Sequence, residues 1–318
     1  MIEFKTIDEQ LEILAEKGLI IPKTNSPRRF LEQENYYDAF SGYKKLFLIK
    51  DPNGNPIKPE QFLPGSHFNE IKALYLFDRD LRMHFLKYLL IFESSFKTVY
   101  AREFSSRHEG VYAYLEMDNY AHSHLKQLKE KIDTLKETLR QNAESEKDLK
   151  VYIAKHRYVP LWVLVNYLTS GEVFRLFAIV KNVDKRAIID YYALKYKKEY
   201  KTNEAPEISI PDMIGILKIM NFVRNRCAHD ERLYDVRFQK KSPFSGITDY
   251  LDFPECNTQR LILLVLYLKI FLDKKQFKQF CTGLKQLFKK YRNSFKTIPF
   301  DAVLDTMGIN EEILQKLK

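Results

Sequence analysis

Residues 69–104, NEIKALYLFDRDLRMHFLKYLLIFESSFKTVYAREF, set the fold class of this chain. Large apolar side chains recur in this segment at spacings of three and four residues: Leu74, Phe77, Leu81, Phe85, Tyr88, Leu89, Phe92 and Phe96. Such spacing places them on one face of an α-helix, whereas a half-buried strand would show strict alternation. The segment therefore predicts one long helix in the core.

Shorter helical segments flank this helix on both sides. Thr6 and Glu9 form a capping box, and Ser26 before Pro27 marks a second helix start, with a helix expected to run to about Asp38. Later helices are expected over 160–168, 172–180, 185–195, 209–229, 258–272 and 274–294, and after Asn310. The turn cluster at residues 51–56, DPNGNP, is expected to join two short strands as a β-hairpin near 45–60.

The composition agrees with an all-α fold. Hydrophobic residues make up 45% of the 318 residues and charged residues 30%, while ten glycines and twelve prolines are few for a loop-rich β protein. We expect an N-terminal helical extension over 1–68, a helical domain over 69–297 and a helical tail over 298–318. Within the domain we expect a charged helical arm at 120–150 and a basic C-terminal helix at 274–296.

The cysteines and the apolar segments indicate the compartment. Cys227, Cys256 and Cys281 form no CxxC pair and no metal-ligand spacing with histidine, so neither a metal nor another cofactor is expected. An odd, scattered set of cysteines fits a reducing compartment. The acidic N-terminus does not resemble a signal peptide, and the apolar run 261–268 is too short to cross a bilayer. A cytoplasmic protein without a membrane partner is predicted.

The net charge of +10 is concentrated near the C-terminus. Residues 269–296 contain nine Lys and Arg against one acid, and so carry +8 of that charge. Six of these basic residues form one stripe: Lys274, Lys278, Lys285, Lys289, Arg292 and Lys296. A lysine stripe is often only a solvated helix face, but its isolation in a nearly neutral chain favours an RNA phosphate backbone as partner. An anionic membrane is the less favoured ligand, because the apolar face of this helix is expected to lie in the core.

Residues 123–150 are highly charged and place apolar side chains at heptad spacing: Leu125, Leu128, Ile132, Leu135 and Leu139. About two heptads are fewer than a coiled coil needs. A helix on the core or a helical hairpin arm is therefore favoured, and a dimer contact is the alternative.

Arg224 and His229, with Asn225 between them, are the candidates for catalysis. An imidazole can accept the proton of a ribose 2′-hydroxyl, or donate one to the 5′-oxygen leaving group. A guanidinium can hold the phosphate and stabilise charge that builds on its non-bridging oxygens. The Asn225 amide can orient the imidazole or contact the phosphate. Such chemistry cuts RNA without a metal ion and leaves DNA intact.

The spacing of Arg224 and His229 is weak evidence by itself, because Arg79/His84 and Arg102/His108 are spaced similarly. The context of the motif is more specific, since it lies at the end of an apolar helix and precedes a polar loop. The chain also contains an ordered series of short segments: 35–37 NYY, 41–43 SGY, 74–82 LYLFDRDLR, Glu93, 160–164 PLWVL, Gly171 and 222–234 FVRNRCAHDERLY.

In their order and spacing, these segments resemble the Abi-like proteins of bacterial abortive-infection systems (the AbiD and AbiF type) and, more broadly, the HEPN superfamily. The resemblance implies a HEPN-like helical bundle, a role in antiphage defence, and Arg224, Asn225 and His229 as a ribonuclease motif. It further implies that two copies of the motif build one site, so a homodimer is expected. A structured non-coding RNA is an expected partner on the same ground.

Two positions depart from the pattern of that family. Ser170 stands where an aromatic residue often precedes Gly171, which is expected to change packing only. Asp230 stands where many relatives have a second histidine, and it places an anion next to His229. Asp230 and Arg232 are expected to support the site.

Glu93 lies among apolar positions of the long helix and needs a partner if it is buried. One hypothesis is that its carboxylate orients Arg224 from the neighbouring helix. The alternative is a local ion pair with Lys97, four residues further on.

The sequence thus predicts a homodimeric, metal-independent endoribonuclease of antiphage defence. His229 would act as acid and base, Arg224 would stabilise the phosphate, and Asn225 would orient the reacting groups. The first alternative is an RNA-binding regulator of the same fold that holds a structured non-coding RNA without cutting it. The second is a helical interaction module with the heptad segment 125–139 as its contact surface.

Overall fold

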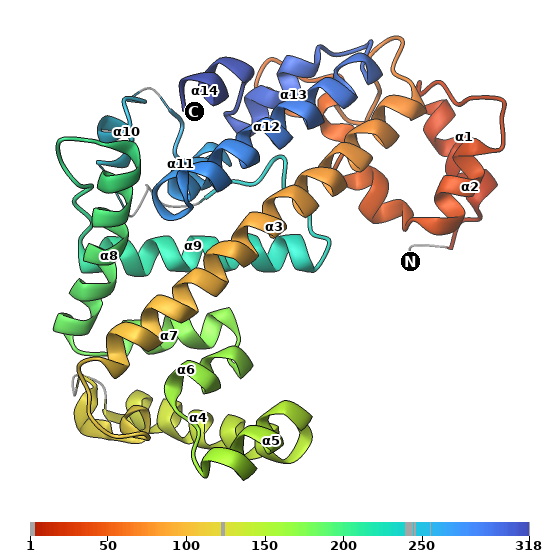
Figure 1. The fold of residues 1–318 in the computed structure, drawn as a ribbon. Coiled ribbons are helices and arrows are strands. Elements are labelled where there is room, and N and C mark those ends of the chain that lie inside the picture. The colour runs from red at the N-terminus through yellow and green to blue at the C-terminus, as the bar shows by residue number, and fades with distance from the viewer. Residues whose placement is uncertain (1–3, 122–124, 239–243, 245, 255, 318) are drawn as a thin grey trace.

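The computed structural model describes residues 4–121, 125–238, 244, 246–254 and 256–317, and within these residues the fold is all-α, as predicted (Figure 1). Short 3-10 turns, one π-helical turn at Tyr37–Ser41 and loops join the helices. The α-helices are α1 (Ile7–Glu16), α2 (Ser26–Gln33), α3 (Phe68–Ser105), α4 (Leu125–Ser145), α5 (Lys147–His156), α6 (Leu161–Leu164), α7 (Ser170–Ile179), α8 (Asn182–Tyr200), α9 (Ile210–Ala228), α10 (Ile247–Tyr250), α11 (Ile262–Phe271), α12 (Lys274–Tyr291), α13 (Phe300–Met307) and α14 (Glu311–Lys316).

Helix α3 runs diagonally through the molecule and organises it (Figure 1). Its 38 residues span about 57 Å at 1.5 Å per residue. The helix begins with a capping box, in which His67 accepts a hydrogen bond from the Asn69 N–H and Glu70 accepts one from the His67 N–H. All of the apolar side chains that predicted this helix are buried. Helices α6, α7, α8, α9, α11 and α12 pack against it.

The N-terminal part differs from the prediction in two places. Helix α2 ends at Gln33 and not near Asp38, because the Asn35 side chain accepts the Tyr37 N–H at 2.8 Å and offers the backbone an alternative to the helix. The expected β-hairpin near 45–60 is also wrong. The described residues there form isolated bridges such as Lys50 to Pro56, since a proline has no N–H with which to extend a ladder.

The charged arm is a hairpin of α4 and α5 that packs on the rest of the chain. Leu128, Ile132 and Leu135 are buried, against α5 and against the 3-10 turns around residues 113–119. The side chain of Leu125 lies outside the described residues. The described apolar side chains of the heptad face are therefore used for packing within the chain.

Helices α9 and α12 carry the candidate functional residues. Helix α9 begins at the predicted cap, where Ser209 and Asp212 form a capping box, and it ends at His229. Helix α12 ends at Tyr291, a turn earlier than the predicted basic helix, and α13 lies within residues 298–318, where a helical tail was expected. None of the described helices combines the length and the apolar character that a membrane span requires.

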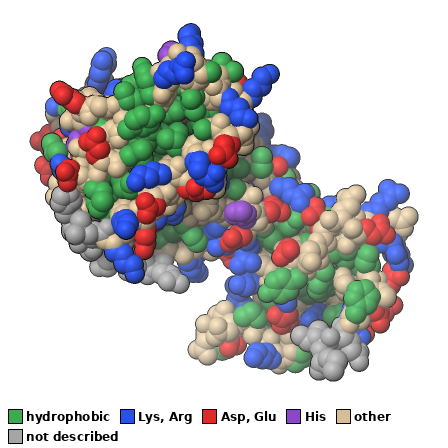
Figure 2. Space-filling view, turned by 90° about the horizontal axis from the view of Figure 1, so that it is seen from below, with side chains coloured by type: hydrophobic (Ala, Val, Ile, Leu, Met, Phe, Trp, Pro, Cys, Tyr) green, Lys and Arg blue, Asp and Glu red, His purple; other side chains and the backbone are tan. Residues whose placement is uncertain are grey.

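Figure 2 shows the molecule from below. Hydrophobic side chains gather on the larger body, which at this end is built from α4 to α6 and exposes Val151, Tyr158 and Trp162. The surface is hollowed between this body and the smaller N-terminal one, and charged and histidine side chains line the hollow (Figure 2).

Candidate functional site

Arg224 lies where α9 crosses α3. Its Nε donates to the Glu93 Oε2 at 3.4 Å, and one of its terminal nitrogens lies 3.5 Å from the Asn225 Oδ1. Both distances are at the long end of the range for hydrogen bonds. The side chain of Arg224 is 31% exposed. The guanidinium is therefore oriented by α3 while part of it remains open to solvent.

Glu93 satisfies both hypotheses at once. One carboxylate oxygen accepts from Arg224, and the other lies 3.0 Å from the Lys97 Nζ on the next turn of α3. The carboxylate is mostly buried, so it needs such partners. Because one anion faces two cations, the cluster of Glu93, Lys97 and Arg224 keeps a net positive charge. That excess charge favours an anionic ligand at the exposed side of Arg224.

A small pocket lies beside this cluster, and α7 contributes to it. Its lining includes Glu93, Arg224, Ser170 and Asn221. The Ser170 hydroxyl donates to the Asn221 Oδ1 at 3.2 Å, which ties the start of α7 to α9. Ser170 was expected to change packing only, and the structure places a polar group at the pocket in place of an aromatic ring. The sequence analysis did not identify Asn221 as part of the site. Its position three residues before Arg224 could have indicated it, because residues at this spacing lie on the same face of a helix.

His229 forms the C-terminal cap of α9, and its side chain is exposed. Its backbone N–H donates to the Asn225 carbonyl at 2.9 Å, whereas the Asn225 amide lies beside Arg224. Arg224 and His229 are five residues apart, which corresponds to about 140° around a helix axis and about 7.5 Å along it. The structure thus places all three residues at one end of α9, but it does not bring the imidazole and the guanidinium into contact within one chain.

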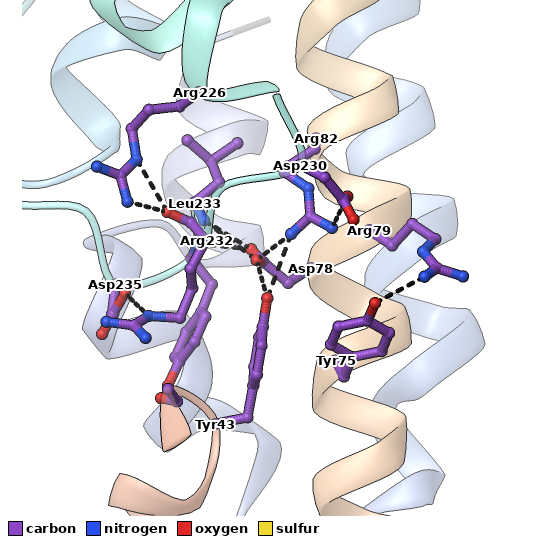
Figure 3. A network of polar contacts seen from close by, with 12 residues as sticks. Tyr43, Tyr75, Asp78, Arg79, Arg82, Arg226, Asp230, Arg232, Leu233 and Asp235 are labelled. Atoms are coloured by element: carbon purple, nitrogen blue, oxygen red, sulfur yellow. Dashed lines mark hydrogen bonds and ion pairs between the residues drawn. The ribbon is translucent and has the colours of Figure 1, made fainter. Parts of the chain in front are cut away.

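Asp230 follows His229 and binds α3 through its side chain. It adopts a left-handed backbone conformation with φ of 58°, and its carboxylate forms an ion pair with Arg82 of α3 (Figure 3). Arg82 is almost completely buried, and its guanidinium also donates to Asp78 at 2.6 Å and to the Tyr43 hydroxyl at 3.2 Å. Asp230 therefore fastens the end of α9 to α3.

Asp78 is the centre of this buried network (Figure 3). Besides Arg82, its carboxylate accepts the Tyr43 hydroxyl at 2.7 Å and the backbone N–H groups of Leu233 and Tyr234, at 3.1 Å and 2.6 Å. Burial raises the pKa of Asp78, whereas Arg82 and the other donors act in the opposite direction. The network joins the N-terminal extension, α3 and the loop after α9.

Arg232 belongs to the same loop and not to the Arg224 cluster. Its Nε donates to Asp235 at 2.5 Å, and its carbonyl accepts two hydrogen bonds from Arg226, at 2.8 and 3.0 Å (Figure 3). Its guanidinium lies so close to Gly42 that a Cβ there would come within 1.8 Å of it. The arginine side chain thus occupies the space that a side chain at Gly42 would fill, and it would have to move if a larger residue stood there.

The basic stripe divides into two parts. Lys274, Lys278, Lys285 and Lys289 lie on α12 within about 60° of one another, and none forms an ion pair with a described residue. Arg292, in the following 3-10 turn, pairs with Asp301 at 3.3 Å and Glu311 at 2.8 Å. Lys296 lies beyond the turn, and its backbone N–H is bound by Glu70. The predicted stripe is therefore continuous only over α12.

The fold and the site define a helical protein with a half-open cationic cluster at one end of α9, fastened by a buried network. The model of the Abi-like protein family matches residues 29–235, more than half of the chain, and the chain belongs to this family. Membership suggests a role in abortive infection, a form of antiphage defence. No curated protein and no solved structure is significantly similar to the chain. The match contains both polar clusters and ends before α12.

Proposed function

We propose that this protein is a metal-independent endoribonuclease of antiphage defence, with a HEPN-type motif at Arg224, Asn225 and His229. The observation that carries the proposal is the cluster at the end of α9. Glu93 orients Arg224 without neutralising it, because the same carboxylate also pairs with Lys97. A half-exposed guanidinium with excess positive charge is suited to bind a phosphate.

In the proposed reaction, His229 takes the proton of a ribose 2′-hydroxyl as the oxygen attacks the adjacent phosphorus. The bond from phosphorus to the 5′-oxygen breaks, and an imidazolium returns a proton to that leaving group. Arg224 stabilises the charge that builds on the non-bridging oxygens. The exposed position of His229 allows an RNA chain to reach it, and the Asn225 amide next to Arg224 gives the phosphate a further donor.

The proposed site is built from two copies of the chain. Because Arg224 and His229 lie about 140° apart around α9, we expect that a single copy does not direct both at one phosphate. Two α9 ends related by a twofold axis would offer an imidazole and a guanidinium from opposite sides. The proposed homodimer therefore completes the catalytic set.

The test is cleavage of end-labelled RNA in EDTA by the purified wild type and by His229→Ala and Arg224→Ala. We expect each substitution to slow cleavage by about 100-fold or more. Matched controls are His156→Ala on α5 and Arg140→Ala on α4, which remove the same side-chain types elsewhere and should leave the rate unchanged. Cleavage that persists in both site variants, or that requires a divalent metal, would refute the mechanism.

A second candidate function is RNA binding without cleavage, as a regulator that holds a structured non-coding RNA. The separation of Arg224 and His229 within one chain favours it, since both side chains can then serve as independent phosphate contacts. A defined RNA that co-purifies with the protein and remains intact in the EDTA assay would select this function over the nuclease.

A further inference from the structure

A groove between α3 and α12 lies outside the clusters described above. Its lining includes Lys87 from α3, together with Lys275 and Lys278 from α12. The polar side chains of Gln279, Thr282 and Gln286 complete the α12 wall. Lys87 belongs to neither the basic stripe nor the Arg224 cluster. Two helices far apart in the sequence thus contribute lysines to one depression.

The floor of the groove is formed by a close approach of the two helices. A Cβ on Gly283 would lie 2.4 Å from the His84 ring, so a larger residue there would require this ring to shift. His84 donates through Nε2 to the Phe280 carbonyl at 2.9 Å and stacks on the Phe280 ring. Burial lowers the pKa of His84 and keeps the ring neutral near pH 7. The positive charge of the groove therefore comes from its lysines.

These lysines are not neutralised by the described part of the chain. No carboxylate is among the residues that line the groove, and Lys87, Lys275 and Lys278 form no ion pair with a described residue. Two cations at the C-terminal end of α12 are paired instead, since Lys290 lies 2.7 Å from Asp80 and Arg292 binds Asp301 and Glu311. Three unpaired ammonium groups in one depression concentrate positive potential there.

We propose that this groove binds the phosphate backbone of RNA, with Lys87, Lys275 and Lys278 as its contacts. The inference rests on the proposed function, in which the protein acts on RNA. It identifies a place on the protein, distant from the reacting phosphate, that binds the RNA strand. Lys274, Lys285 and Lys289 continue the unpaired surface along α12, which is about 27 Å long. Arg292, at the end of the predicted stripe, is paired and is therefore not part of this unpaired surface.

The chemistry of the groove favours RNA over an anionic membrane. A helix that lies on a membrane buries its apolar face in the lipid, while its cationic side chains contact the anionic headgroups. The apolar face of α12, which includes Phe277, Phe280, Leu284 and Phe288, is already buried in the protein core. What α12 presents to solvent at the groove is lysine, glutamine and threonine, which bind phosphate oxygens by charge and hydrogen bonds.

The test measures binding of a fluorescein-labelled single-stranded oligoribonucleotide over a range of salt concentrations, in EDTA and in a His229→Ala background that prevents cleavage. The groove variant carries Lys87→Gln, Lys275→Gln and Lys278→Gln. The control variant carries Lys290→Gln, Arg292→Gln and Lys316→Gln, which removes the same charge from paired cations. We expect the slope of log K against log salt to fall by about 2 in the groove variant, at about 0.7 for each lost phosphate contact. The control variant should retain the parental slope.

Each outcome decides between the proposals. RNA binding with an unchanged slope in the groove variant, or equal losses in both variants, overturns the groove and leaves the proposed function intact. If the parental protein binds no RNA, the proposed function fails as well. Vesicles that contain phosphatidylserine serve as the second probe, and groove-dependent binding to vesicles without RNA binding would assign the groove to a membrane.

Discussion

Two polar clusters connect α3 to the end of α9, and they differ in how completely their charges are paired. In the first, Asp78 and Arg82 are buried, and the Asp78 carboxylate accepts hydrogen bonds from a guanidinium, a hydroxyl and two backbone N–H groups. In the second, Arg224 is partly exposed and makes only long contacts, one of them to a carboxylate shared with Lys97.

The difference separates architecture from function. A buried charge that loses its partner destabilises the fold strongly, so the first cluster has to be satisfied within the chain. A partly exposed cation keeps some of its hydration and can exchange it for a ligand, so the second cluster tolerates incomplete pairing. Both clusters lie within residues 29–235, the part that matches the Abi-like family, so membership alone does not distinguish their roles.

The largest effect is expected from Asp78→Ala. The substitution leaves Arg82 buried without its main partner and frees the N–H groups of Leu233 and Tyr234, so the free energy of unfolding should fall by about 3–5 kcal/mol. Urea denaturation followed by circular dichroism measures it. The control is Asp80→Ala, which removes the half-exposed contacts of Asp80 with Lys290 and the Tyr291 hydroxyl and should cost about 1 kcal/mol. Equal losses in the two variants would mean that the network is not a structural element.

Arg224→Ala should reduce activity strongly and stability little, whereas Asp78→Ala should mainly reduce stability. We expect cleavage to slow by about 100- to 1,000-fold, because the phosphate loses its main cation, while the melting temperature hardly changes, because Glu93 keeps Lys97. Arg224→Lys retains the charge but loses the planar fork, so it should bind RNA nearly as well as the wild type and cleave it more slowly. If Arg224→Ala unfolds the protein as readily as Asp78→Ala does, the distinction between the clusters is wrong.

Glu93→Gln tests the positioning of Arg224 with an isosteric change. Loss of the anion leaves more positive charge at the site, so RNA should bind more tightly while cleavage slows by about tenfold, as Arg224 loses its orientation. Binding and single-turnover cleavage are measured separately. Glu103→Gln is the control, since Glu103 lies on the same helix and pairs with Arg102 and with Arg107 just beyond the end of α3. A parallel fall of binding and cleavage would point to a merely structural role for Glu93.

The smallest effect contrasts a buried histidine with an exposed one. Burial lowers the pKa of His84 below 6.5, so the unfolded chain binds this proton more readily than the folded one. Stability should therefore be highest above pH 6.5 and decrease as the pH falls below it. Melting curves between about pH 7.5 and about pH 5.5 should show a weaker dependence in His84→Gln, and no such change in His229→Ala, whose side chain is exposed in the fold. An unchanged dependence in His84→Gln would contradict this assignment.

Much of the helical architecture could be predicted because its signals are local. The spacing of apolar residues predicted α3, and Ser209 predicted the start of α9. The errors arose where a local signal had a competitor. Asn35 ends α2 early through a side-chain hydrogen bond, and prolines prevent the expected hairpin from forming a ladder.

The candidate site could be predicted only in part. Arg224, Asn225 and His229 were identified as one motif, but the motif did not show that the Asn225 amide lies beside Arg224 or that Asp230 turns toward Arg82. From the sequence, Arg224 and Lys97 were alternative partners of Glu93. In the structure both are partners, because each carboxylate oxygen contacts one of them. Ser170 and Asn221 lie in segments far apart in sequence, so no local pattern joins them.

The sequence by itself determined the helical class, the position of α3, the start of α9 and the location of the motif, because periodicity and capping act within one or two turns of chain. Tertiary structure alone decided which charges are paired. Asp78 with Leu233 and Lys87 with Lys275 are brought together by the packing of α3 against elements more than a hundred residues away in the chain. Whether a charged residue supports the fold or remains available to a ligand depends on that packing, since burial and partners, not residue type, set the cost of leaving it unpaired.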